Sequence, residues 1–285
     1  MNILISGLNN YVGRRCTNLM ADENFHVFAI TRNRALFEKR LSEPLHAEVF
    51  EYDLLKGETD GQINVPDLKA SFYFTQVPTL DDIVNLRVEL LCLRNFIHLV
   101  KRMGCNRIVY VARLMDKQAL EPILNLLKEF ALDYTVILKN IVLGKDCLLY
   151  NVYRSIAKKR FVFYSKRYGG NLLQPIGVND FVRWLKAVLD VPAFHYTVLE
   201  VGGAETITAV DLYGVFRDLK LKLASQTVVY LPHWLLNLIS KRSVASDTAM
   251  AEFLRGIQEE SVVANTWKKH LSFTFSSIEQ ILLAE

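Results

Sequence analysis

Two glycines near the N-terminus are spaced as in a turn that binds a phosphate group. The segment Gly7-Leu8-Asn9-Asn10-Tyr11-Val12-Gly13 follows the apolar run Asn2–Ser6 and precedes a helical pattern. Where a strand passes through a glycine turn into a helix, backbone N–H groups and the helix dipole face an anion, and small residues let the backbone approach a pyrophosphate. The turn therefore predicts a dinucleotide site.

Asn10 departs from the GxxGxxG form of this turn, because it stands where the middle glycine is expected. Asparagine tolerates a left-handed backbone better than most residues, but its side chain can crowd a pyrophosphate. The turn either still binds a dinucleotide or belongs to a Rossmann-type domain that has lost the nucleotide. In the first case we expect the contacts to come from Gly7, Asn9, Asn10, Tyr11, Val12 and Gly13.

The residues after the second apolar run, His26–Thr31, bear on the choice of nucleotide. NAD-specific turns place an acid there to bind the ribose 2′-OH. Here the sequence is Thr31-Arg32-Asn33-Arg34, and two guanidinium groups suit a 2′-phosphate. NADP(H) is therefore favoured over NAD(H), with an ordinary solvated arginine pair as the alternative. Asp53, at the end of the third run, is placed to meet an adenine edge.

Short apolar runs alternate with helical periods through the first half of the chain. The clearest helical period extends from Ile83 to Val100, with apolar residues three and four apart, and Gly104 ends it. Parallel neighbours need crossover connections, so this alternation predicts an α/β fold with a doubly wound parallel sheet. The expected strands are Asn2–Ser6, His26–Thr31, Glu48–Tyr52, Ser71–Gln76, Arg107–Ala112 and Tyr134–Leu138.

After Gly144 the rhythm of the sequence becomes irregular. We expect helices near residues 147–156, 178–189 and 209–219 and a strand at Thr197–Val201. These patterns predict a Rossmann domain over residues 1–145, to which residues 178–203 return. Residues 146–285 are expected to form a smaller, mostly helical lobe.

Composition excludes several classes of protein. The 285 residues are 51% hydrophobic, and the net charge of +4 is too small to predict nucleic-acid or anionic-membrane binding. Four scattered cysteines and six isolated histidines have no metal-ligand spacing, so we expect no metal site and reduced thiols. The N-terminus lacks the basic region of a signal peptide, and no apolar stretch reaches the roughly 20 residues of a membrane span, which predicts a cytoplasmic protein.

One basic segment stands out from this balanced background. Residues 157–167 hold five of the 34 basic residues and no acidic one, interleaved with aromatic side chains. Such a segment could face an anionic ligand or single-stranded nucleic acid. We favour the alternative, in which residues 161–164 form a strand with solvated basic ends.

Taken together, several segments resemble the short-chain dehydrogenase/reductase superfamily, in its atypical NAD(P)H-binding branch of NmrA-like and epimerase-like proteins. The likeness covers about residues 1–220 in the right order. The turn is similar to the branch's GATGYVG, Thr31-Arg32 to its strand-two arginine, Tyr52-Asp53-Leu54 to its GDL, residues 106–110 to its KRIIY, residues 174–180 to its QPIAVRDV and residues 199–203 to its YDVGG.

The resemblance implies a dinucleotide domain followed by a small C-terminal substrate lobe. It also implies that the cofactor is bound beyond the glycine turn, by the ends of the second to fifth strands. The residues at these ends are Thr31, Arg32, Asp53, Leu54, Thr75, Gln76, Val77 and Ala112.

Catalytic members of that superfamily use a Tyr-x-x-x-Lys pair after the fifth strand and a serine at the end of that strand. Their tyrosine transfers a proton, and the nearby cation lowers its pKa. Here residues 111–133 contain no tyrosine, and Ala112 stands in place of the serine. The only Tyr-x-x-x-Lys, Tyr52 to Lys56, belongs to the adenine end. Three residues after the fifth and sixth strands are weak candidates for a substitute acid: Arg113, Lys139 and Asn140.

Three functions stay open on these grounds. The first is an NADP(H)-binding sensor, regulator or assembly factor without the catalytic pair, and the second is an NADP(H)-dependent reductase or epimerase-like enzyme with an unusual active site. The third is a cofactor-free interaction module. The expected partners are a dinucleotide together with a small carbonyl or quinone ligand or a partner protein, and neither nucleic acid nor a membrane.

Overall fold

The computed structural model describes residues 1–39, 41, 44–57, 63–157, 161–165, 170–221, 227–231 and 261–284. The chain divides into two compact units. The first unit consists of Met1–Lys139, Val182–Glu200 and Thr266–Leu271, and the second of Asn140–Phe181, Val201–Asn265 and Ser272–Glu285. The cations of the basic segment, Lys158, Lys159, Arg160, Lys166 and Arg167, lie outside the described residues.

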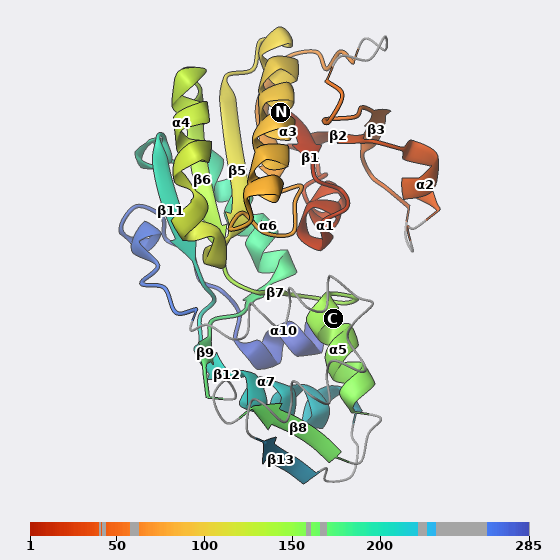
Figure 1. Cartoon of the computed structure of the whole chain (residues 1–285), viewed down its shortest axis with the longest axis vertical. Coiled ribbons are helices and arrows are strands. Elements are labelled where there is room, and N and C mark those ends of the chain that lie inside the picture. The colour runs from red at the N-terminus through yellow and green to blue at the C-terminus, as the bar shows by residue number, and fades with distance from the viewer. Residues whose placement is uncertain are drawn as a thin grey trace. The chain divides into compact units, whose positions relative to one another are not determined.

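The first unit is built on a seven-stranded parallel sheet (Figure 1) with the order β11-β6-β5-β4-β1-β2-β3. This order confirms the predicted α/β fold, and it places the point where the strand order reverses between β1 and β4. In such sheets ligands bind outside the carboxyl ends of the strands at this point. The strands are β1 (Asn2–Ser6), β2 (His26–Thr31), β3 (Glu48–Glu51), β4 (Leu68–Phe74), β5 (Arg107–Arg113), β6 (Asp133–Lys139) and β11 (Thr197–Val201).

The fourth strand differs most from its predicted range. It begins at Leu68, three residues earlier than expected, and ends at Phe74 instead of Gln76. The backbone N–H of Gln76 donates to the carboxylate of Glu89 at 2.9 Å and not to a neighbouring strand. A side chain from outside the sheet therefore ends the strand.

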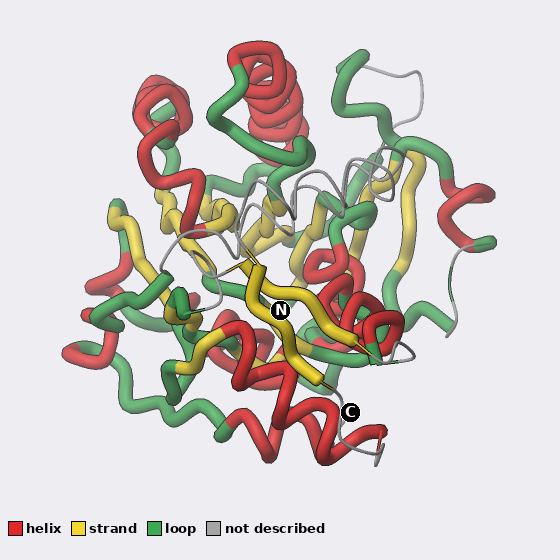
Figure 2. Tube along the Cα trace, turned by 60° about the horizontal axis from the view of Figure 1, so that its bottom comes forward, coloured by secondary structure: helices red, strands yellow, loops and turns green. Residues whose placement is uncertain are grey.

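Helices cover both faces of the sheet, as Figure 2 shows for the strands in yellow and the helices in red. Tyr73 packs beneath α3 (Ile83–Arg102), with its ring 5.2 Å from that of Phe96. Its neighbour Phe74 points to the opposite face and lies beside Gly13 of α1 (Tyr11–Leu19). The other described helices of this unit are α2 (Arg34–Glu38), α4 (Glu121–Glu129), most of α6 (Val178–Leu189) and the 3-10 turns Leu114–Ala119, Pro192–Phe194 and Thr266–Lys269.

The second unit consists of short strand pairs and helices. Gly202 and Gly203, at the end of the segment 199–203, pack against Gln174 and Pro175. A Cβ on Gly203 would lie 1.8 Å from the Pro175 carbonyl oxygen. The predicted helix at 209–219 ends at Phe216 and continues as one π-helical turn. The elements are β7 (Val142–Leu143), α5 (Leu148–Ile156), β8 (Phe161–Ser165), β9 (Leu172–Leu173), β10 (Ile176–Gly177), β12 (Ile207–Thr208), α7 (Ala209–Phe216), β13 (Thr227–Leu231) and α10 (Ile278–Ala284).

Within the described ranges, no helix combines the length and apolar character needed to cross a membrane. The same part of the chain holds no group of three His, Cys, Asp or Glu residues arranged to hold a metal ion.

Candidate functional site

The glycine turn joins β1 to α1 at the point where the strand order reverses. Gly7 has a φ of 89°, a conformation that favours glycine, and a Cβ there would lie 2.7 Å from Phe74 of β4. A Cβ on Gly13 would lie 2.5 Å from the Gly7 carbonyl oxygen, and the Asn10 N–H donates to that oxygen at 2.9 Å. Both glycines therefore let α1 pack closely on the ends of β1 and β4.

Asn10 is the N-cap of α1, and its backbone is extended rather than left-handed, with φ −76° and ψ 136°. The expected tolerance of asparagine for a left-handed backbone is thus not used. Instead, its Oδ1 accepts a hydrogen bond from the Val12 N–H at 2.9 Å. This N–H is one of the donors that a helix N-terminus offers to a phosphate. The asparagine side chain thus occupies part of the anion site.

The two arginines after β2 differ in their surroundings. The Arg34 guanidinium is paired with Glu38 at 2.6 Å, and its backbone N–H donates to Glu51 at 3.2 Å. Arg32 is exposed, and among the described residues no hydrogen bond or ion pair engages its side chain. Thr31 is buried, and its carbonyl accepts the Tyr52 N–H at 2.8 Å. Arg32 is therefore the guanidinium available to an anion.

The structure gives Asp53 and Leu54, at the end of β3, local structural contacts. The Asp53 carboxylate accepts the Leu55 N–H at 3.0 Å and so stabilises the turn that follows the strand. Leu54 is buried in the core beneath α3, and its carbonyl accepts a hydrogen bond from Asn95 at 2.8 Å. Only the partly exposed Asp53 side chain has access to a ligand.

The residues after β4 lie beside the glycine turn. The Gln76 side-chain amide donates to the Phe74 carbonyl at 2.7 Å and lies over Gly7, 3.1 Å from the position a Cβ would take there. Thr75 is buried, and its hydroxyl donates to the Val111 carbonyl at 2.9 Å. Val77 packs against the core. The structure therefore brings Gly7 and Gln76 together at one end of the sheet.

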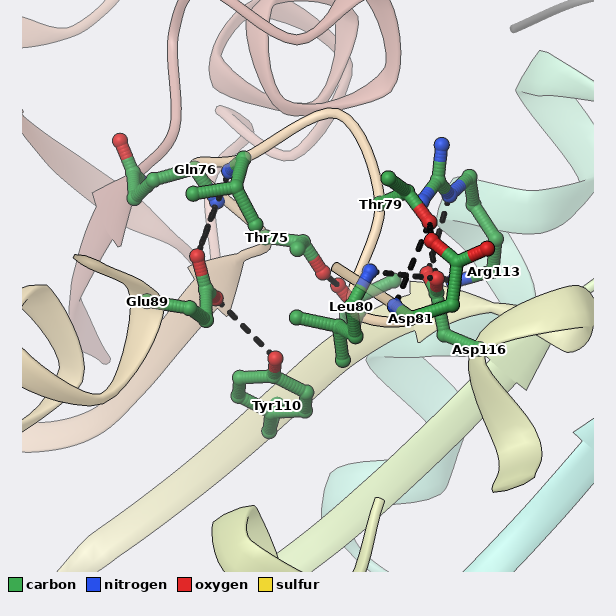
Figure 3. A network of polar contacts seen from close by, with 11 residues as sticks. Thr75, Gln76, Thr79, Leu80, Asp81, Glu89, Tyr110, Arg113 and Asp116 are labelled. Atoms are coloured by element: carbon green, nitrogen blue, oxygen red, sulfur yellow. Dashed lines mark hydrogen bonds and ion pairs between the residues drawn. The ribbon is translucent and has the colours of Figure 1, made fainter. Parts of the chain in front are cut away.

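Glu89 of α3 is a functional candidate that the sequence prediction missed (Figure 3). It is fully buried, and its Oε2 accepts the N–H of Gln76 at 2.9 Å and that of Val77 at 3.3 Å. Its Oε1 accepts the Tyr110 hydroxyl at 3.0 Å. Burial raises the pKa of Glu89 to about 7, although the Gln76 N–H and the Tyr110 hydroxyl act to lower it. The sequence signal that could have identified Glu89 is its position as an acidic residue within the apolar stripe between Leu86 and Leu93.

The ends of β5 and β6 hold two of the substitute acids expected from the sequence, Arg113 and Lys139, which are register partners. Arg113 forms a two-pronged ion pair with the buried carboxylate of Asp116, at 2.9 and 2.8 Å. That carboxylate also accepts the Leu80 N–H at 3.1 Å (Figure 3). Burial and the nearby Arg113 lower the pKa of Lys139 to about 8. Ala112 is a buried core residue.

Asn140, the third candidate, belongs to the second unit. Its side chain donates to the Ser261 carbonyl, and its Oδ1 accepts the Ile141 N–H at 2.8 Å and the Ser261 hydroxyl at 3.3 Å. Because it is buried and these bonds use both ends of its amide, Asn140 has the contacts of a structural residue.

Comparisons with known proteins support the fold. No protein-family model matches the sequence, and no curated protein is significantly similar to it. Among solved structures, a nucleoside-diphosphate-sugar epimerase from Staphylococcus aureus superposes with a TM-score of 0.67 at 14% identity, covering 99% of each chain. The Citrobacter sp. triphenylmethane reductase complexed with NADP(H) gives 0.67 at 15% identity, covering 100% of each chain.

A third similar structure is the UDP-glucuronic acid 4-epimerase from Bacillus cereus in complex with UDP-glucuronic acid and NAD. It superposes with a TM-score of 0.67 at 14% identity and covers 100% of this chain and 98% of the epimerase. At such identities the likeness concerns the backbone. The chain therefore shares the fold of these two epimerases and this reductase.

Proposed function

We propose that this protein binds NADP(H) at the carboxyl ends of β1, β2 and β4 and acts as a nucleotide-dependent sensor, regulator or assembly factor. The observation that carries the proposal is the close-packed turn, in which Gly7 and Gly13 set the N-terminus of α1 against the strand ends. A pyrophosphate at this N-terminus would meet backbone N–H groups and the positive end of the helix dipole.

The residues around the turn fit a phosphorylated ribose on one side. Arg32, exposed and unengaged among the described residues, can meet a 2′-phosphate with a bidentate pair of N–H groups. Asp53 can accept from the adenine amino group once it gives up part of its turn. Asn10 must release the Val12 N–H for the pyrophosphate to use that donor, which predicts moderate rather than tight binding.

A role without the usual redox chemistry is favoured by the region after β5. Residues 111–133 hold no tyrosine, so the Tyr-Lys pair is absent there. Arg113, which follows the strand, is already held by the Asp116 carboxylate and is not available as a proton donor. These features support binding as the function.

Titration calorimetry with NADPH and NADH tests this proposal. We expect saturable NADPH binding, which Arg32→Ala weakens by about tenfold to a hundredfold, the equivalent of one charge-assisted contact. NADH affinity should change little in the same variant, because NADH lacks the 2′-phosphate. Arg34→Ala is the matched control, since its guanidinium is paired with Glu38, and it should weaken NADPH binding less.

Two results would contradict the proposal. If neither nucleotide binds saturably, the cofactor-free interaction module becomes the better explanation. If Arg32→Ala lowers the affinity for NADPH and NADH equally, the preference for NADP(H) has another cause than the 2′-phosphate.

An NADP(H)-dependent reductase or epimerase-like enzyme is the second candidate, and Lys139 is the observation that favours it. With a pKa lowered to about 8, its ammonium group can donate a proton near neutral pH to the oxygen of a small carbonyl or quinone. When bound, NADPH would supply the hydride. Consumption of NADPH across a carbonyl and quinone panel, abolished by Lys139→Met but unaffected by Lys128→Met on the exposed face of α4, would favour this enzyme over the sensor.

A further inference from the structure

A buried carboxylate of α3 binds the backbone of the segment after β4. Both oxygens of Glu89 are used, Oε2 by the backbone N–H groups of Gln76 and Val77 and Oε1 by the Tyr110 hydroxyl (Figure 3). An ionised carboxylate only accepts hydrogen bonds, and charged acceptors form bonds about twice as strong as neutral ones. The charge of Glu89 therefore strengthens each of these contacts.

The groups that face Glu89 do not neutralise it. Tyr73 of β4, Tyr110 of β5 and Cys92 of α3 are neutral, and Asp116, from the turn after β5, is acidic. The nearby Arg113 is paired with Asp116. Among the described residues, hydrogen bonds and not a cation stabilise the charge of Glu89. The pKa of this buried carboxyl therefore lies near neutral pH.

Protonation must change the contacts of Glu89. A proton added to Oε2 displaces an N–H of Gln76 or Val77, whereas a proton added to Oε1 can take the lone pair that the Tyr110 hydroxyl leaves free. In both cases the carboxyl loses its charge, which weakens the hydrogen bonds that remain. The Gln76 side chain lies over Gly7, so the affected segment borders the glycine turn.

We propose that Glu89 is a positioning residue of the dinucleotide site: ionised, it holds the segment after β4 against α3, and its protonation loosens that segment. This inference rests on the proposed function for its consequence, since a ligand seated beside Gln76 then binds better when Glu89 has lost its proton. We call the hold of Glu89 on residues 76 and 77 the clamp, and it can be tested without any ligand.

Amide NMR on the ligand-free protein tests the clamp directly. Between pH 5.5 and 8.5 the Gln76 and Val77 amide shifts should follow one titration with a midpoint near 7 in the wild type. They should stay constant in Glu89→Gln, because glutamine keeps an acceptor for the amides and a donor for the Tyr110 oxygen but does not titrate. Glu129→Gln is the control, since it makes the same change on an exposed carboxylate of α4. In this variant the Gln76 and Val77 amide shifts should titrate as they do in the wild type.

A second variant keeps the test decisive if Glu89→Gln fails to fold. Tyr110→Phe removes one donor to the carboxylate, which should move the midpoint of the amide titration upward. The clamp is overturned if both amides stay flat in the wild type, or if they titrate unchanged in Glu89→Gln or in Tyr110→Phe.

NADPH affinity measured against pH tests the consequence. We expect the wild-type affinity to rise with pH below the midpoint, by at most about tenfold per pH unit for one linked proton. The same measurement on Glu89→Gln isolates the titration of the nucleotide phosphate, which occurs near pH 6. Equal pH profiles for the two proteins would overturn the linkage. An absence of NADPH binding at every pH would instead refute the proposed function, and the amide titration would still judge the clamp.

Discussion

A single residue, Asn10, sets the balance between helix stability and anion binding at the turn. Its side chain gives α1 the hydrogen bond that a glycine at this position cannot supply. The same bond covers an N–H that a pyrophosphate would use. The residue therefore favours the ligand-free protein, and changing it should shift stability and affinity in opposite directions.

Replacement of Asn10 should separate these two effects. Asn10→Ala removes the cap and should lower the free energy of unfolding by about 1 kcal/mol, whereas Asn10→Gly should lower it by only a few tenths. Asn10→Gly should also tighten NADPH binding, because the Val12 N–H becomes available. Urea unfolding and calorimetry measure the two quantities. Asn9→Gly, on the exposed neighbour, is the control, and equal gains in affinity from both glycine variants would argue against a role for the cap.

At the scale of elements, the approach of α1 to β1 positions the whole candidate site. The N-terminus of α1 lies against the strand ends because neither Gly7 nor Gly13 carries a Cβ. A helix shifted away from this position would point its first N–H groups elsewhere. Glycine at position 13 is thus required by packing, whether or not a nucleotide binds.

Gly13→Ala should therefore be destabilising although alanine favours helices. The added methyl group would lie 2.5 Å from the Gly7 carbonyl oxygen, and the strain should cost about 1–3 kcal/mol of unfolding free energy. Gly214→Ala in α7 is the matched control, because its Cβ meets no atom within 4 Å, and it should stabilise the protein by about 0.5–1 kcal/mol. Thermal unfolding followed by circular dichroism distinguishes the two, and a neutral Gly13→Ala would show that α1 is free to move.

At the scale of the whole molecule, two ionisable groups with shifted pKa values, the buried Glu89 and the partly exposed Lys139, make stability depend on pH. The pKa of Glu89 is raised to about 7 and that of Lys139 is lowered to about 8, in both cases mainly by burial. Between these values both groups are ionised within the first unit. Folding is therefore least favoured by this pair near neutral pH, where both groups carry their charge in the folded protein.

Glu89→Gln should reveal the part of this pH dependence that comes from Glu89. The carboxyl has a higher pKa in the folded protein than its usual 4.5, so its stabilising contribution is complete below about pH 4.5 and is lost as pH rises through about 7. The variant should match the wild type near pH 5 and exceed its unfolding free energy at pH 8, by up to about 3 kcal/mol from 1.36 kcal/mol per pKa unit. Urea unfolding at the two pH values measures this. A difference of the same size at both would exclude titration of Glu89 as its cause.

The order of elements could be predicted because each depends on local patterns. The ranges of β1, β2 and β11 match the expected strands, and α3 follows the spacing of its apolar residues from Ile83. Such patterns also predicted that the sheet would be parallel, since crossover helices leave no other arrangement. The site residues named from the sequence remain predictions, as does the preference for NADP(H).

By itself, the sequence determined the fold, the place of the glycine turn and the absence of a tyrosine after β5, because these depend on residue type and on spacing along the chain. Only the tertiary structure decided which polar groups are already engaged. Arg113 is held by Asp116, Asn10 caps α1, and Glu89 reaches the segment after β4. The first two contacts join residues close in the chain, but the structure shows which of several possible partners each polar group takes. The contact between Glu89 and Gln76 exists because α3 packs on the sheet, and no local pattern encodes it.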